Sequence, residues 1–328
     1  MRYRDILDQF QNRKALVVGD LMLDEYVFGR ATRISPEAPV MVVRQQSTKN
    51  LPGGAANVAR NLIALGAKVS MVGVVGCDQA GETLEQTLVE HGVEIGGVVR
   101  EPDRTTTRKM RVLADTAHQV LRIDHEDERD VSPKTERRLL DQAEMHLVDC
   151  DVVIVSDYLK GSVTPEIARR VIDLGRKRGI PVVANPKPQS LEHYRGCTLL
   201  SLNRYEAGEA VGAWRGLEDA DALGAARTIR ERIGVEAVLI TLGESGMVVD
   251  GPWDAVIPAP RVEVYDTAGA GDTVVATVAL GLSSHGFERS VFTLAAQTAA
   301  SVVRRVGVAT PAPQDLADIA ALRDGEVS

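Results

Sequence analysis

The stretch VEVYDTAGAGDTVVATVAL (residues 262–280) is the most informative part of the sequence. We expect a strand ending at Asp266, a glycine-rich turn, and a helix beginning near Gly269. Glycines let the backbone approach a ligand closely, and the free N–H groups of a first helical turn bind anions. Asp272 falls within that first turn, where the helix dipole favours an ionised carboxylate. Backbone donors beside a carboxylate that can accept a proton suit phosphoryl transfer.

A second glycine-rich stretch, LPGGAANVARNLIALG (51–66), also leads into a predicted helix. Gly53 and Gly54 precede that helix, and Asn57 lies in its first turn. The Asn57 amide can both donate and accept hydrogen bonds, which suits a sugar with neighbouring hydroxyls. For each stretch taken alone, the alternative is a glycine turn whose polar residue only caps the helix.

The composition narrows the class of protein. The 328 residues are 44% hydrophobic and 26% charged, which predicts a soluble globular chain with a large core. A net charge of −8 and 4% aromatic residues argue against a nucleic-acid-binding surface. We see no signal peptide and no membrane span, and we expect no membrane partner and a cytoplasmic location. Cys77, Cys150 and Cys197 are widely spaced, which predicts free buried thiols.

Apolar, β-branched runs alternate with helical patterns along the chain. This alternation predicts a mostly parallel sheet with helices on both faces, and ligands beyond the carboxyl ends of the strands. The predicted strands are 15–20, 68–76, 151–157, 181–185, 199–203 and 237–243. The predicted helices are 54–66, 133–147, 164–179, 218–233, 269–286, 288–307 and a short one after 310.

Two segments, 24–46 and about 105–123, alternate with period two and show no helical pattern. TTTRKMRVL and HQVLRID predict antiparallel strands joined by a turn from Asp115 to His118. We interpret the two segments as a small β-sheet lid on a single domain that covers residues 1–328. Lid strands with an apolar outer face could pair between subunits, so we expect a homodimer through the lid.

Taken together, the two glycine-rich stretches resemble the signatures of the ribokinase-like (PfkB) family of carbohydrate kinases. GGxxxN stands here as Gly53 to Asn57, and DTxGAGD as Asp266 to Asp272. The resemblance implies a ribokinase-like α/β fold with a β-sheet lid, and ATP as co-substrate. It also implies that Asp272 is the catalytic base, that Gly269, Ala270 and Gly271 form the anion hole, and that Gly53, Gly54 and Asn57 bind the sugar.

Other positions follow the pattern of the family. Asn203-Arg204-Tyr205-Glu206 matches its NxxE motif, which implies that Asn203 and Glu206, the latter through water, arrange Mg²⁺ near the nucleotide phosphates. TLGESGMVV (241–249) matches the T-x-G-x-x-G segment beside the nucleotide. The implied nucleotide-binding residues are Asn203, Arg204, Tyr205, Glu206, Thr241, Gly243 and Gly246.

Asp24 occupies the position of an aspartate that binds sugar hydroxyls, and Asp20 is a second candidate. Gln297, Asn185 and Val308 depart from the pattern of the family and leave the contacts to the nucleotide base open. The sequence also leaves open whether a monovalent cation binds near Asp266 and Thr267.

Narrower stretches resemble one branch of the family, the D-glycero-β-D-manno-heptose 7-phosphate kinases. They are VVGDLMLDEYVFG (17–29), TRISPEAPVMVV (32–43), LPGGAANVA (51–59), and TTTRKMRVL with QVLRIDHE (105–126). The resemblance implies transfer from ATP to the anomeric hydroxyl, giving a 1,7-bisphosphate for lipopolysaccharide core (ADP-heptose) synthesis.

A phosphorylated substrate calls for cations on the lid side of the site. Lys109 and Arg111 are two residues apart on a predicted strand and therefore share a face. Arg122 can join them from the next strand, and Arg33 and Lys187 are looser candidates. The alternative is a set of solvated charges on an edge strand.

Kinases of the family that this chain resembles often have a fused nucleotidyltransferase domain with an HxGH motif. This sequence contains no HxGH, so we expect a stand-alone kinase without that domain. Two alternatives remain: a ribokinase-like kinase for another sugar, sugar phosphate or nucleoside, or a non-catalytic sugar-phosphate sensor. A dinucleotide-binding oxidoreductase and a P-loop enzyme are excluded, because the sequence has neither a GxGxxG after the first strand nor a P-loop.

Overall fold

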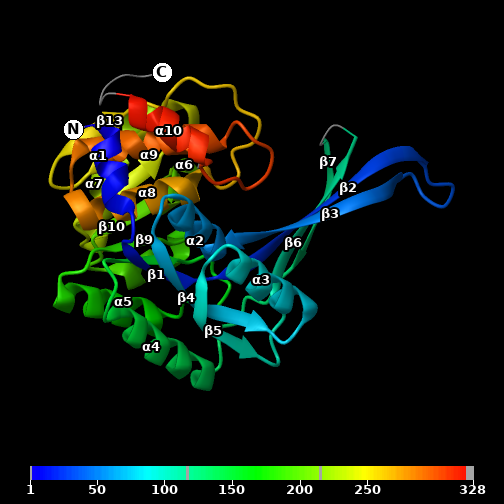
Figure 1. Ribbon diagram of the computed structural model, residues 1–328, viewed down its shortest axis with the longest axis horizontal. Coiled ribbons are helices and arrows are strands. Elements are labelled where there is room, and N and C mark those ends of the chain that lie inside the picture. The colour runs from blue at the N-terminus through cyan, green and yellow to red at the C-terminus, as the bar shows by residue number, and fades with distance from the viewer. Residues whose placement is uncertain (1, 116–117, 214–215, 323–328) are drawn as a thin grey trace.

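The computed structural model describes residues 2–115, 118–213 and 216–322, which form a large α/β domain and a second sheet that projects from it (Figure 1). The large sheet has the strand order β13-β12-β11-β10-β9-β8-β1-β4-β5. Its strands are β1 (Lys14–Gly19), β4 (Lys68–Gly76), β5 (Glu94–Glu101), β8 (Val152–Ser156), β9 (Val182–Asn185), β10 (Leu199–Asn203), β11 (Ala237–Thr241), β12 (Met247–Asp250) and β13 (Asp254–Ile257).

The strands from β11 to β5 pair in parallel, and β12 and β13 add an antiparallel edge. The α-helices are α1 (Tyr3–Phe10), α2 (Ala55–Ala64), α3 (Gln79–Glu90), α4 (Pro133–Leu147), α5 (Pro165–Arg178), α6 (Arg204–Ala210), α7 (Ala222–Ile233), α8 (Ala270–His285), α9 (Arg289–Val302) and α10 (Pro313–Ala321). Short 3₁₀ turns are η1 (Pro188–Tyr194), η2 (Asp219–Asp221) and η3 (Gly243–Ser245).

Two apolar clusters cover the two faces of the large sheet. One joins the sheet to α1, α2, α3, α8, α9 and α10, and the other joins it to α4, α5, α6 and α7. Strands buried on both faces need continuous apolar runs, and such runs were the basis of the strand predictions. The predicted parallel sheet with helices on both faces is therefore confirmed.

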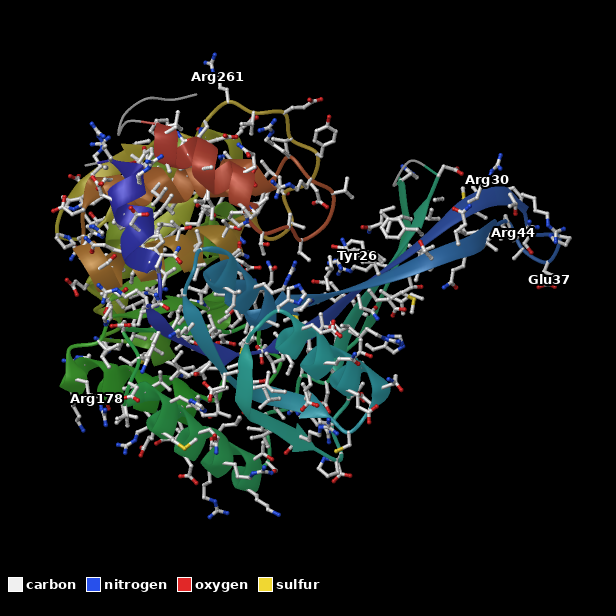
Figure 2. All side chains as sticks on the ribbon, in the orientation of Figure 1. Tyr26, Arg30, Glu37, Arg44, Arg178 and Arg261 are labelled. Carbon is white, nitrogen blue, oxygen red and sulfur yellow. The ribbon has the colours of Figure 1, made fainter. Side chains whose placement is uncertain are left out.

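The projecting sheet consists of β2 (Leu21–Ile34), β3 (Met41–Gly54), β6 (Thr107–Ala114) and β7 (His118–His125), in the order β3-β2-β6-β7. The β2–β3 and β6–β7 pairs are antiparallel, whereas β2 and β6 are parallel. The predicted hairpin over 105–123 is confirmed, but residues 116–117 of its turn lie outside the described residues. Figure 2 places Tyr26 near the domain and Arg30, Glu37 and Arg44 toward the far end of the β2–β3 ribbon.

The predicted strand ending at Asp266 is wrong. Residues 262–265 have no regular structure, and Val264 and Tyr265 are exposed. The Tyr265 and Asp266 N–H groups donate to the Val303 carbonyl instead of to a neighbouring strand. The large sheet ends at β13, so this segment has no strand to pair with.

The sequence also left several elements unpredicted. Helix α1 lies in a polar N-terminal stretch, but Tyr3, Ile6 and Phe10 are buried along one of its faces. The helix α3, the strand β5 and the hairpin β12–β13 were not predicted either. The predicted short helix after 310 is α10. None of the described helices is long and apolar enough to cross a membrane.

All three cysteines are free, as predicted, but only Cys197 is buried. Cys77 is exposed because it directly follows the end of β4, in the turn before α3, and Cys150 is half-buried. The prediction of three buried thiols is therefore corrected.

Candidate active site

A pocket of about 170 Å³ opens at the carboxyl ends of the parallel strands. It lies between the end of β10, the loop after β8 and the first turn of α8. The side chains and backbone that line it include Tyr158, Asn185, Lys187, Asn203, Glu206, Thr241, Gly269, Gly271 and Asp272. Parts of three sequence motifs, remote from one another along the chain, therefore meet in one pocket.

Asp272 lies in the first turn of α8, and its side chain is almost completely buried. The Asn57 amide donates to Asp272 Oδ2 at 2.7 Å, and the Tyr158 hydroxyl donates to Oδ1 at 3.1 Å. Burial raises the pKa of Asp272 to about 6, although both hydrogen bonds favour the ionised form. The predicted ionised carboxylate thus depends on a pH above about 6.

The turn before α8 depends on Gly269. Its φ is +83°, and an added Cβ would lie 2.9 Å from Asn57 Nδ2. The Asp266 carboxylate stabilises this turn. It accepts hydrogen bonds from the N–H groups of Ala268 and Gly307, each at 2.9 Å. Of the predicted anion-hole residues, Gly269 and Gly271 line the pocket, while the Ala270 N–H donates to the Thr267 carbonyl at 3.3 Å.

On the side of the projecting sheet, Asp24 is buried and ion-paired with Arg111. A Cβ added at Gly53 would lie 2.1 Å from Asp24 Oδ2, so only glycine leaves room for this carboxylate. Gly54 takes a left-handed φ of +56° where the chain enters α2. The four residues that the resemblance assigns to the sugar therefore lie together: Asp24, Gly53, Gly54 and Asn57.

Three of the predicted cations on this side have a carboxylate partner. Lys109 pairs with Glu126 at 3.4 Å, and Arg111 pairs with Asp24. Arg122 stands opposite Arg111 in the β6–β7 register, as predicted, but it pairs with Asp124. Arg33 is an exposed residue near the end of β2. Lys109, Arg111 and Arg122 are therefore balanced by acids, and a substrate phosphate would have to compete with those acids.

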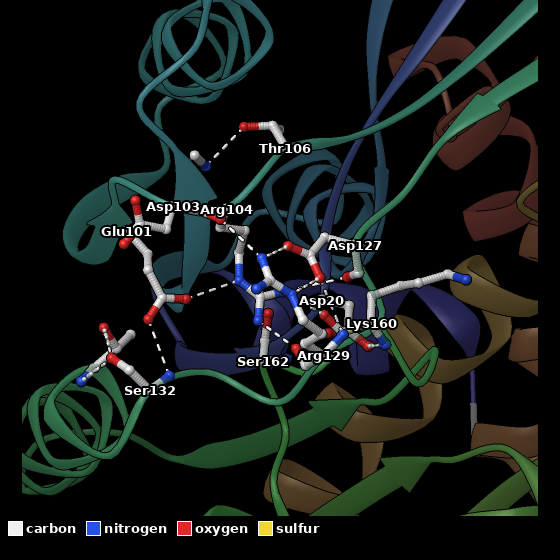
Figure 3. Close-up of polar contacts among 12 residues, drawn as sticks. Asp20, Glu101, Asp103, Arg104, Thr106, Asp127, Arg129, Ser132, Lys160 and Ser162 are labelled. Carbon is white, nitrogen blue, oxygen red and sulfur yellow. Dashed lines mark hydrogen bonds and ion pairs between the residues drawn. The ribbon is translucent and has the colours of Figure 1, made fainter.

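Asp20 differs from Asp24 because it has no exposed surface. Its Oδ2 accepts the N–H groups of Tyr158 at 2.7 Å and Lys160 at 3.0 Å, and its Oδ1 accepts that of Ser162 at 3.0 Å. Figure 3 shows this carboxylate among the loop residues that it holds. The structure thus gives Asp20 the task of fixing the loop after β8, rather than the predicted contact with sugar.

The NxxE motif forms the start of α6. Asn203 caps the helix, with Oδ1 accepting the Glu206 N–H at 2.9 Å, and Glu206 Oε2 accepts the Asn203 N–H at 2.8 Å. Glu206 Oε1 accepts a hydrogen bond from Lys187 at 2.5 Å. Arg204 turns toward the Leu242 carbonyl and Asp219, and Tyr205 is 79% exposed. Asn203 and Glu206 therefore line the pocket, whereas Arg204 and Tyr205 point elsewhere.

The remaining predicted nucleotide residues lie at the end of β11 and in the turn that follows it. Thr241 lines the pocket, and Gly243 and Gly246 take left-handed φ values of +66° and +93°. Asn185, a departure from the pattern of the family, also lines the pocket and donates to the Ser201 carbonyl at 2.7 Å. Gln297 in α9 and Val308 are both buried.

Glu206 is an acidic side chain that lines the pocket beside Asn203. The described residues contain no group of three or more His, Cys, Asp or Glu side chains that could enclose a metal. Mg²⁺ keeps several waters and needs only one or two protein carboxylates beside the phosphates. Glu206 and Asn203 therefore fit a Mg²⁺ ion held mainly by ATP phosphates and water.

Sequence analysis missed two residues of this site. Tyr158 lies two residues beyond β8. Its place just after a predicted strand, at the edge of the sheet where ligands bind, was the one sign of a role in the site. Arg60, one turn after Asn57, is buried and donates to Asn57 Oδ1 and to the Val308 carbonyl, each at 3.3 Å. Its position on the predicted helix gave no sign that it is buried beside the site.

The fold and the pocket define a carbohydrate kinase that uses ATP. The chain belongs to the pfkB family of carbohydrate kinases, whose sequence profile matches residues 12–315. It is 42% identical over 316 residues to the bifunctional protein HldE of Geobacter sulfurreducens, and 41% identical over 317 residues to HldE of Gluconobacter oxydans. These matches cover 95% of this chain but only 64% and 65% of the relatives, so the chain spans somewhat less than two thirds of their length.

Solved structures share the fold. Escherichia coli phosphofructokinase-2 in complex with potassium has a TM-score of 0.79 at 21% identity, covering 95% of this chain and 99% of the other. Arabidopsis thaliana ribokinase complexed with ribose and ATP has a TM-score of 0.72 at 19% identity, covering 95% and 99%. The ribokinase-like α/β fold predicted from the sequence is confirmed.

Proposed function

We propose that this kinase transfers the γ-phosphoryl group of ATP to the anomeric hydroxyl of D-glycero-β-D-manno-heptose 7-phosphate. The product is the 1,7-bisphosphate, a precursor of ADP-heptose for the lipopolysaccharide core. The substrate is inferred from the four stretches that resemble the heptose 7-phosphate kinases. The similarity to HldE proteins over 95% of this chain supports the same choice.

One observation carries the proposed chemistry: Asp272 stands where the two halves of the site meet. Asn57, hydrogen-bonded to Asp272 Oδ2, comes from the side that holds Asp24 and Gly53. Asn203, Glu206 and Thr241 line the same pocket from the other side. A base that takes a proton from a sugar hydroxyl while ATP phosphates approach from the opposite side needs this position.

Each group has a separate task in this proposal. Asp272 accepts the proton of the attacking hydroxyl, and Asn57 and Asp24 orient the sugar. Backbone N–H groups at the start of α8 stabilise the charge that develops on the transferred phosphoryl group. Mg²⁺, when bound near Glu206 and Asn203, neutralises charge on the ATP phosphates. The projecting sheet acts as a lid that excludes water from the reaction.

The test is ATP consumption with Mg²⁺ against heptose 7-phosphate, fructose 6-phosphate, ribose and adenosine, followed by phosphorus NMR of the product. We expect turnover with heptose 7-phosphate and a second phosphorus signal at the anomeric position. Turnover with only one of the other three compounds would replace the proposed substrate with that sugar or nucleoside. Binding of heptose 7-phosphate without turnover under any condition would favour the sensor.

A further inference from the structure

Tyr158 contacts the proposed base directly but belongs to neither glycine-rich motif. It follows β8, and its hydroxyl donates to Asp272 Oδ1 at 3.1 Å. Asn57, from α2, donates to the other oxygen at 2.7 Å. Both carboxylate oxygens are therefore held by donors from different elements. Because each oxygen can accept more than one hydrogen bond, Asp272 can still accept a proton from the pocket side.

The loop that carries Tyr158 is fixed in one conformation. Asp20, fully buried, accepts the Tyr158 N–H at 2.7 Å and two further N–H groups of the same loop. Leu159, the next residue, has a left-handed φ of +56°, and its N–H donates to Asp157 Oδ1 at 2.9 Å. A strained backbone of this kind persists only where its surroundings determine it, and such strain gathers at functional sites.

A second anchor reaches the loop from the base of the projecting sheet. Arg104, a buried residue just before β6, donates to the Lys160 carbonyl at 2.9 Å and to the Asp127 carbonyl at 3.3 Å (Figure 3). Its side chain also donates to the Arg129 carbonyl. The loop is therefore tied to both segments by which β6 and β7 join the domain.

The Tyr158 ring is fixed as well. Lys187 Nζ lies 4.8 Å from the ring centroid, a distance at which an ammonium group is attracted to an aromatic face. Lys187 in turn binds Glu206. The ring thus lies between the proposed base and the residues of the NxxE motif, in contact with both sides of the pocket.

We propose that Tyr158 is a positioning residue for the base: its hydroxyl and the Asn57 amide together hold the Asp272 carboxylate in a single orientation toward the pocket. This inference rests on the proposed role of Asp272. Loss of the Tyr158 hydroxyl removes a donor that favours the charged carboxylate, so the pKa of Asp272 should rise. Asp24 also raises this pKa and Lys187 lowers it, and neither is altered by the substitution used below.

The experiment compares Tyr158→Phe with Tyr194→Phe. Tyr194 is also buried, and its hydroxyl donates to Asp157 Oδ2 at 2.8 Å, on the same loop but away from Asp272. The first readout is a carbon-13 NMR titration of the aspartate carboxyls, with Asp272→Asn assigning the signal. It needs no substrate. The second readout is kcat/KM between pH 5.5 and 8.5, measured with whichever of the four compounds tested above the wild-type protein phosphorylates.

We expect Tyr158→Phe to raise the pKa of Asp272 by about one unit, and Tyr194→Phe to leave it unchanged. The loss in kcat/KM should then be about fivefold larger at pH 6 than at pH 8.5. An unchanged pKa in Tyr158→Phe, or an equal rise in both variants, would overturn the inference. If the wild-type protein phosphorylates none of the panel, the proposed substrate fails, while the NMR comparison still decides the role of Tyr158.

Discussion

At the scale of single residues, Asp272 carries the chemistry of the proposed reaction. Asp272→Asn keeps the size of the side chain but removes its ability to accept a proton. We expect kcat to fall by about 10²–10⁴-fold, the usual contribution of a general base, with little change in the KM for ATP or sugar. Steady-state kinetics of the folded variant measure this. A kcat within a few-fold of wild type would remove Asp272 from the role of base.

The same residue links activity to stability. Burial raises the pKa of Asp272 from 3.8 to about 6, so the ionised carboxylate costs about 3 kcal/mol in the folded state above pH 6. In wild type this cost disappears as the pH falls through 6 toward 4, because the folded state then binds the proton. The uncharged amide of the Asp272→Asn variant never incurs it, although this variant loses one hydrogen bond, worth about 1 kcal/mol.

We therefore expect Asp272→Asn to be more stable than wild type by about 1–2 kcal/mol at pH 8, and to lose this advantage near pH 4. Urea unfolding at both pH values measures the difference. A stability gap that stays constant with pH would show that the pKa of Asp272 is not raised in the folded protein.

At the scale of elements, the β3–α2 junction shapes the side of the site where we propose that the sugar binds. An alanine Cβ at position 53 would lie 2.1 Å from Asp24 Oδ2, so Gly53→Ala must displace this carboxylate. We expect the KM for the sugar to rise at least tenfold, equivalent to about 1.4 kcal/mol, while the KM for ATP is unchanged. Gly96→Ala is the matched control, because an added Cβ at Gly96 in β5 meets nothing within 4 Å.

Equal effects of Gly53→Ala and Gly96→Ala on the sugar KM would contradict the steric argument. A parallel rise in both KM values for Gly53→Ala would indicate general disruption of α2 rather than displacement of Asp24. Thermal unfolding of the two variants separates these cases.

The elements also show what local patterns predict. Continuous apolar runs predicted β1, β4, β8, β10 and β11, because a strand buried on both faces has few other compositions. The predicted strand before Asp266 failed, since Val264 and Tyr265 have the composition of a strand but no neighbouring strand to pair with. Helix α1 was missed because its apolar face is short and surrounded by charges.

Within the site, motifs predicted Asp272, Asn57 and Glu206 but not the contacts among them. The contacts of Tyr158 and Asp20 depend on the conformation of the loop after β8. The spacing of residues in the sequence does not predict that conformation. Asp20 and Asp24 are both acids near the end of a strand, yet Asp20 is saturated by backbone amides whereas Asp24 meets Arg111. Only three-dimensional packing separates such residues.

At the scale of the whole molecule, the projecting sheet exposes apolar residues and two strand edges, β3 and β7. Ile34, Met41, Leu121 and Ile123 are at least 40% exposed on this sheet. We predict that two copies pair through it to form a homodimer, which sedimentation analysis would show as twice the 35.3 kDa mass of the chain.

Leu121 and Ile123 lie two residues apart on β7, so replacing both with Lys places two charges on one face. We expect this double variant to be monomeric, while Val148→Lys, an exposed position after α4, leaves the dimer intact. A monomeric wild type at micromolar concentration would refute the predicted dimer.

The anchoring of the projecting sheet by Arg104 also has a mechanical consequence. A sheet that is attached to a domain at one end moves least near the attachment and most at its free end. Arg104 clamps the segments before β6 and after β7, while the β2–β3 ribbon has register shifts at Phe28/Gly29 and Ala31/Arg33, farther from the domain. We therefore expect the projecting sheet to be stiff beside Asp24, where we propose that the sugar binds, and more compliant toward its tip, where we predict that a second subunit pairs.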